Sequence, residues 1–81
     1  MPFDIIKIDG SFITHIDSDP SSFAIVKAIT EIALAFKRKT VAECVENETT
    51  EKIARVLGID YGQGFYYSKP IPIDSLIQYK Q

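Results

Sequence analysis

The sequence is poor in several features that mark particular classes of protein. The 81 residues include no tryptophan and only one cysteine, Cys44. Because a disulfide needs two cysteines, an internal disulfide cannot form. A single thiol is compatible with a reducing compartment, and we expect a cytoplasmic protein. No apolar stretch approaches the roughly 20 residues that span a bilayer, and the first residues lack a basic segment followed by an apolar one. We therefore expect no membrane association.

An excess of positive charge is also absent. The formal net charge is -2 and the pI is about 5.2, which argues against a DNA or RNA partner. Hydrophobic residues make up 46% and charged residues 25% of the chain, a balance typical of a folded globular domain. The length suffices for one small domain with little core to spare.

Hydrophobic patterning predicts alternating strands and helices. The expected strands cover about 3–9, 40–46 and 59–67, and the expected helices about 20–38, 49–57 and 73–79. Alternating βα units predict an α/β fold with three parallel strands and right-handed crossovers. A parallel sheet needs helices on its faces and protection or pairing at its two outer edges. Three strands are few for such a sheet, so we expect it to be incomplete.

Capping residues predict where the helices begin and end. Asp19 suits the N-cap of the first helix and Pro20 its first turn, while Asn47 or Thr49 would cap the second helix and Gly58 would end it. The first helix carries a broad apolar stripe that we expect to be buried. The stripe consists of Phe23, Val26, Ile29, Ala33 and Phe36, widened by Ile25 and Ile32. Pro70 and Pro72 are expected to stop the third strand.

Polar side chains occur at the end of each predicted strand. Lys7 and Asp9 end the first strand, Glu43 and Glu46 the second, and Gln63 lies in the third. The carboxyl ends of parallel strands meet at one edge of a sheet, where sites of α/β proteins lie. These side chains are therefore predicted to converge on a polar ligand or a metal.

Structural explanations compete with that prediction. Lys7 and Asp9 could form a buried ion pair, since burying an unpaired lysine is costly. Glu43 and Glu46 could simply be exposed at a strand end. The segment Gly62–Gly64 could be a turn, or a place where the backbone bends or something approaches closely.

Four sequence blocks resemble consecutive blocks of one family. They are Asp4–Ile13 (DIIKIDGSFI), Val41–Glu46 (VAECVE), Gly58–Phe65 (GIDYGQGF) and Ser68–Pro70 (SKP). In this order and spacing they resemble the EAL family, bacterial phosphodiesterases that hydrolyse the second messenger cyclic di-GMP in signal transduction. The resemblance implies a (β/α)8 barrel of the TIM type in the complete domain, with residues 1–81 as its last three βα units.

The resemblance also implies roles for the polar residues. Lys7 would engage the metal-bound water and the phosphate, and Glu43 would be a metal ligand or general base. Gln63 and Glu46 would line the site, and Asp9 would have a structural pairing role. The implied cofactors are Mg²⁺ or Mn²⁺, which generate a hydroxide and hold the phosphate for in-line attack.

Several family motifs are missing from these residues. The E-A-L tripeptide, the metal-binding asparagine and glutamate, and the paired aspartates all precede the K-I-D block in the family, and Cys44 replaces a glycine. We expect the chain alone to bind no metal and to be inactive. Its expected partner is the missing amino-terminal half or a second copy. The alternatives are a non-catalytic module that self-associates through open sheet edges, and a protein that only binds the nucleotide.

Overall fold

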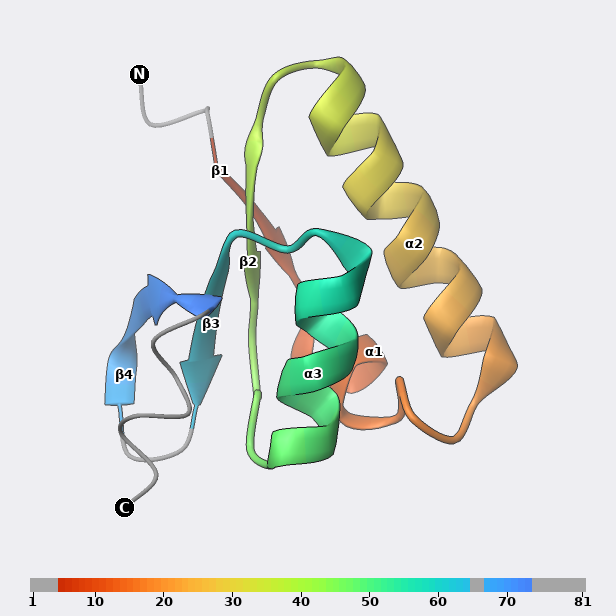
Figure 1. Ribbon diagram of the computed structural model, residues 1–81, viewed down its shortest axis with the longest axis vertical. Helices are drawn as coiled ribbons and strands as arrows, with labels where there is room; N and C mark the ends of the chain where they lie inside the picture. Colours follow the sequence, from red (N-terminus) through yellow and green to blue (C-terminus); the bar gives the residue numbers. More distant parts are fainter. Residues whose placement is uncertain (1–4, 65–66, 74–81) are drawn as a thin grey trace.

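The computed structural model describes residues 5–64 and 67–73, and it shows a four-stranded sheet packed against helices (Figure 1). The strands are β1 (Ile5–Ile8), β2 (Lys39–Ala42), β3 (Tyr61–Gly64) and β4 (Tyr67–Pro72), in the order β1-β2-β3-β4. The helices are α1 (Gly10–Thr14), α2 (Pro20–Ala35) and α3 (Glu48–Leu57). Strands β1, β2 and β3 are parallel. The α/β class with three parallel strands is confirmed.

Side-chain caps fix the ends of the two longer helices. The Asp19 carboxylate accepts a hydrogen bond from the Ser21 N–H at 3.0 Å, and Pro20 is the first residue of α2. Asn47, and not Thr49, caps α3 by accepting from the Thr50 N–H at 2.8 Å. Gly58 ends α3 with a φ of 89°, a left-handed conformation that costs glycine little.

The second strand is shorter than predicted. It ends at Ala42 instead of about residue 46, because the backbone turns at Cys44, where φ is +61°. Val45 nevertheless remains fully buried. The first strand covers Ile5–Ile8, and Asp9 is the N-cap of α1 instead of a strand residue. Residues 3 and 4 of the predicted 3–9 lie outside the described residues.

The prediction of one third strand that stops at the prolines was wrong. The parallel strand β3 ends at Gly64, and β4 pairs with β3 in the antiparallel direction with a register shift between Gly62 and Gly64. Pro70 and Pro72 lie inside β4, which tolerates them because an edge strand needs no N–H on its outer side. The predicted helix over 73–79 lies, apart from Ile73, outside the described residues.

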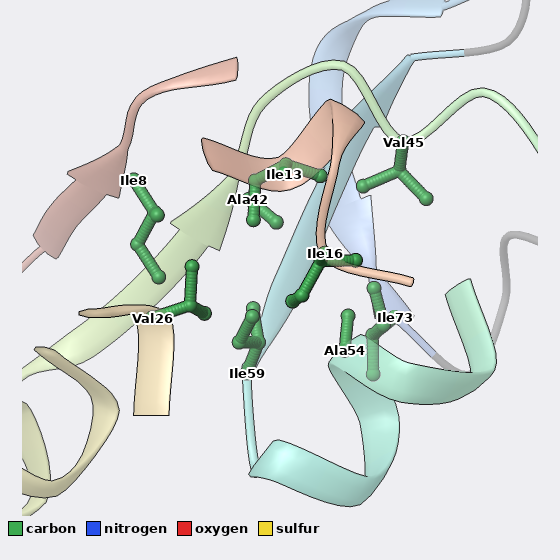
Figure 2. Close-up of a cluster of buried hydrophobic side chains, with 9 residues drawn as sticks. All are labelled: Ile8, Ile13, Ile16, Val26, Ala42, Val45, Ala54, Ile59 and Ile73. Carbon is green, nitrogen blue, oxygen red and sulfur yellow. The ribbon is translucent and has the colours of Figure 1, made fainter. Parts of the chain in front are cut away.

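The core lies between the sheet and the helices (Figure 2). It is formed by Ile8, Ile13, Ile16, Val26, Ala42, Val45, Ala54, Ile59 and Ile73. Two of these, Ile13 and Ile16, come from α1 and the turn after it, so the segment between β1 and α2 packs onto the core as a helical turn. Only part of the predicted stripe on α2 is buried. Val26 and Ala33 are inside, whereas four others are exposed, namely Phe23, Ile25, Ile32 and Phe36.

Candidate functional site

The register of the parallel strands places three of the five predicted site residues, Lys7, Glu43 and Gln63, on one face. Lys7 pairs with Val41, and Val41 pairs with Tyr61. Side chains alternate between the two faces of a strand, so Lys7 shares its face with the residues that follow Val41 and Tyr61 by two, Glu43 and Gln63. The opposite face packs on the helices through the residues of the core (Figure 2).

Two backbone hydrogen bonds hold the strand ends together beyond the regular sheet. The Glu43 N–H donates to the Ile8 carbonyl at 3.1 Å, and the Val45 N–H donates to the Gln63 carbonyl at 2.9 Å. The segment after β2 is therefore attached to β1 on one side and to β3 on the other. This attachment fixes Glu43 beside the ends of both neighbouring strands.

A hollow of about 290 Å³ opens at this edge of the sheet. It is lined by Glu43, Cys44, Glu46, Gln63 and Gly64. Glu43 and Gln63 are half-buried, and Glu46 is exposed. The structure thus brings three of the five predicted site residues into one polar hollow.

Two glycines allow the chain to close around this hollow. At Gly64, φ is +155° and a Cβ would overlap the backbone of Val45. The group that approaches the glycine pair closely is therefore the backbone of Val45. At Gly10, a Cβ would overlap the sulfur of Cys44. The contact between Gly10 and Cys44 was missed in the sequence, where the only signal is a small residue directly after the strand.

Lys7 and Asp9 lie outside the lining of the hollow. Both are exposed, so the alternative of a buried ion pair between them is wrong. The Asp9 carboxylate instead caps α1, where it accepts hydrogen bonds from the hydroxyl and the N–H of Ser11. The hydrogen bond from the Ser11 side chain, and then that from its backbone, lower the pKa of Asp9. These contacts agree with a structural role for Asp9, in which its partner is Ser11 and not Lys7.

The carboxylates of the hollow do not form a complete metal site. Within residues 5–64 and 67–73, no group of three or more His, Cys, Asp or Glu side chains is arranged to hold a metal ion. A Mg²⁺ or Mn²⁺ ion takes about six ligands in near-octahedral geometry, mostly oxygens. Glu43 and Glu46 alone do not fit this demand.

Comparison with known proteins identifies the family. The sequence model of the EAL domain matches residues 1–70. The chain belongs to the EAL domain family. This EAL chain is 49% identical over 73 residues to the cyclic di-GMP phosphodiesterase PdeA of Borreliella burgdorferi, a match that covers 90% of the chain but 11% of that protein. The chain therefore represents a part of an EAL domain, its C-terminal part.

Solved EAL structures contain the same arrangement of strands and helices. The EAL enzyme Bd1971, solved with cGMP bound, superposes with a TM-score of 0.78 at 35% identity over 99% of this chain and 21% of its own. A standalone EAL protein of Vibrio cholerae, solved with cyclic di-GMP, gives a TM-score of 0.74 at 27% identity over 83% of this chain and 28% of its own. The sheet of this chain corresponds to one part of the TIM-type barrel of those EAL structures.

Proposed function

We propose that this chain supplies the C-terminal part of the active site of a cyclic di-GMP phosphodiesterase. The observation that carries the proposal is the polar edge formed by Lys7, Glu43 and Gln63, on one face and at the carboxyl ends of three parallel strands. Sites of parallel α/β barrels lie at this end. A relative that shares 49% of the aligned residues is named for this activity, and a solved neighbour holds cyclic di-GMP.

Each side chain has a chemical task in this proposal. The exposed ammonium of Lys7 neutralises the charge that develops on the phosphate during attack. The Glu43 carboxylate accepts a proton from the attacking water, or it would serve as one ligand of a divalent cation in a complete domain. Gln63 and Glu46 line the pocket and orient the substrate. Asp9 holds α1 in place directly after the strand that carries Lys7.

Hydrolysis requires residues beyond this chain. Mg²⁺ or Mn²⁺, the cations implied for the family, would take one carboxylate from Glu43 and their remaining ligands from the preceding part of an EAL domain. We therefore propose that the chain acts only together with that part and is inactive alone. The expected setting is the cytoplasm. None of the described helices is long and apolar enough to cross a membrane.

The test is hydrolysis of cyclic di-GMP by a reconstituted domain. The chain would be co-expressed with the EAL segment of Borreliella PdeA that precedes the matched region, and assayed with Mg²⁺ or Mn²⁺. Lys7→Ala and Glu43→Gln should each lower the rate by about 100-fold or more, whereas Lys52→Ala, a change of an exposed lysine on α3, should not. A purified complex without any hydrolysis would refute the proposal.

A second candidate is a non-catalytic module that self-associates. It is favoured by one observation, the β1 edge, which pairs with no other strand within residues 5–64 and 67–73. Exposed strand edges promote pairing between chains. Sedimentation of the chain alone distinguishes the two, because this candidate requires a stable oligomer.

A further inference from the structure

The first residue of α1, Gly10, lies directly beside the turn that carries Glu43. The register pairs Ile8 with Ala42, and Gly10 and Cys44 each follow these partners by two residues. Gly10 is buried. The atoms nearest to a Cβ built on it would be the sulfur of Cys44, the Cβ of Cys44 at 3.0 Å and the Cβ of Glu43 at 3.8 Å. The space beside Gly10 is therefore taken by Glu43 and the residue that follows it.

The turn at Cys44 has little freedom to move. Its φ of +61° lies in the left-handed region, a narrow part of backbone space for a residue with a side chain. Before the turn, the Glu43 N–H donates to the Ile8 carbonyl at 3.1 Å. After the turn, the Val45 N–H donates to the Gln63 carbonyl at 2.9 Å. A shift of this turn must therefore strain a hydrogen bond to β1 or to β3.

A side chain at the position of Gly10 would displace this turn. Rotation of the thiol relieves an overlap with the sulfur of Cys44, but the 3.0 Å approach to its Cβ is relieved only by moving the backbone. Movement of that backbone shifts Glu43, the preceding residue. Without the side chain of Cys44, only the ordinary contact with the Glu43 Cβ at 3.8 Å remains. The need for glycine at this position thus depends on Cys44.

We propose that Gly10 is a positioning residue of the candidate site. Because it has no side chain, it leaves room for the turn at Cys44, and this turn holds Glu43 at the edge of the hollow. Gly10 and Cys44 form a matched pair, in which a side chain at one position requires its absence at the other. The inference rests on the proposed function, and it adds a residue outside the lining of the hollow on which the place of Glu43 depends.

The test combines substitutions at the two positions in the reconstituted domain, the full chain bound to the preceding EAL segment of Borreliella PdeA. Gly10→Ala should lower kcat for cyclic di-GMP at least about 10-fold with little change in KM, because a displaced Glu43 affects the attack more than binding. In the Cys44→Gly background, the same substitution should lower kcat by less than about two-fold. In the Cys44→Ala background the loss should be intermediate, because the approach to the Cβ remains.

The matched control is Gly58→Ala, the same change at a glycine with nothing within 4 Å of a built Cβ. Its positive φ makes the substitution destabilising, yet kcat of the folded complex should stay unchanged. Equal losses of kcat for Gly10→Ala in all three backgrounds would overturn the proposal, as would an equal loss for Gly58→Ala. Where Gly10→Ala with Cys44 present does not fold, the milder overlap in the Cys44→Ala background decides the comparison.

Hydrogen exchange of the chain alone gives a readout that needs no activity. Gly10→Ala should speed exchange of the Glu43 amide at least about 10-fold, because the displaced turn weakens its hydrogen bond to Ile8. The Cys44→Gly background should abolish this increase. The Ile59 amide, which is bonded to α3, should keep its rate, which separates a local shift from global unfolding. An unchanged rate at Glu43 would contradict the proposal. The expected exchange in a complex that hydrolyses no cyclic di-GMP would refute the proposed function and leave the matched pair supported.

Discussion

The two edges of the sheet are built differently. The β4 edge is antiparallel, contains Pro70 and Pro72, and is followed by Ile73, whose N–H donates to the Asp60 carbonyl at 3.0 Å. The β1 edge is parallel, contains no proline and presents the backbone of an apolar strand. Proline is a device that hinders further pairing at the edge of a sheet. Among the described strands, the β4 edge thus carries such protection and the β1 edge does not.

The largest effect on stability is expected from a substitution at Gly64, the last residue of β3, which pairs with β4. Gly64→Ala places a Cβ against the Val45 backbone at a φ of +155°, so we expect a loss of at least about 3 kcal/mol in the free energy of unfolding. Gly58→Ala is the control, because φ is also positive there but nothing lies within 4 Å, and it should cost about 1 kcal/mol. Urea unfolding measures both. Equal costs would show that the approach of Gly64 to Val45 is not needed.

A smaller effect is expected where the start of β2 is tied to the segment before β3. The Asp60 carboxylate accepts from the N–H of Thr40 at 2.9 Å and from its hydroxyl at 3.3 Å. Asp60→Ala leaves the buried Thr40 N–H without this acceptor, at a cost of about 2 kcal/mol. Asp17→Ala, in an exposed turn, should change stability by less than about 0.5 kcal/mol. Chemical unfolding measures both free energies. Equal losses for Asp60→Ala and Asp17→Ala would show that the hydrogen bonds between Asp60 and Thr40 do not stabilise the fold.

Asp9 gives the open side of the sheet a dependence on pH. Hydrogen bonds from Ser11 hold the pKa of Asp9 below its ordinary value of 3.8. Its contribution to stability is therefore fully present above that value and is lost as the pH falls through the lower pKa of the folded state. The difference in stability between the unchanged chain and Asp9→Ala should be present at pH 6 and shrink below about pH 3.8. A difference that grows on acidification would contradict this.

The smallest change in stability is expected from removing the prolines of β4. The double variant Pro70→Thr and Pro72→Thr should alter the free energy of unfolding by less than about 0.5 kcal/mol, because both side chains are exposed. It should nevertheless increase self-association, since it restores N–H donors to an outer strand. Light scattering at rising concentration measures the effect. No increase would mean that the prolines do not protect this edge.

The sequence predicted what depends on local chemistry. The caps at Asp19 and Gly58 and the three parallel strands follow from residue types and periodicity, and they are present in the structure. The strand β4 was missed, because proline argues against a strand in general and only tertiary context reveals an outer position. The broad stripe of α2 was predicted as buried, because periodicity cannot distinguish a surface covered by this chain from one covered by another.

The candidate site could also be predicted only in part. The polar residues at the strand ends were identified from the sequence, and parallel pairing explains why Glu43 and Gln63 meet at one edge. Glu46 lines the same hollow beyond the turn at Cys44, which was not predicted from the sequence. The separate positions of Lys7 and Asp9 did not follow, because the capping of α1 by Asp9 depends on the turn after the strand. The roles of these five residues in catalysis stay predictions.

Hydrogen exchange at β1 shows directly whether a preceding EAL segment pairs with the outer edge of this strand. In the chain alone, the amides of Ile6 and Ile8 should exchange slowly, because they face β2, and those of Ile5 and Lys7 should exchange fast. Once the preceding EAL segment is bound, exchange at Ile5 and Lys7 should slow by at least 10-fold, with little change at Ile6 and Ile8. A complex in which the Ile5 and Lys7 amides still exchange at the rate of the free chain would contradict the account.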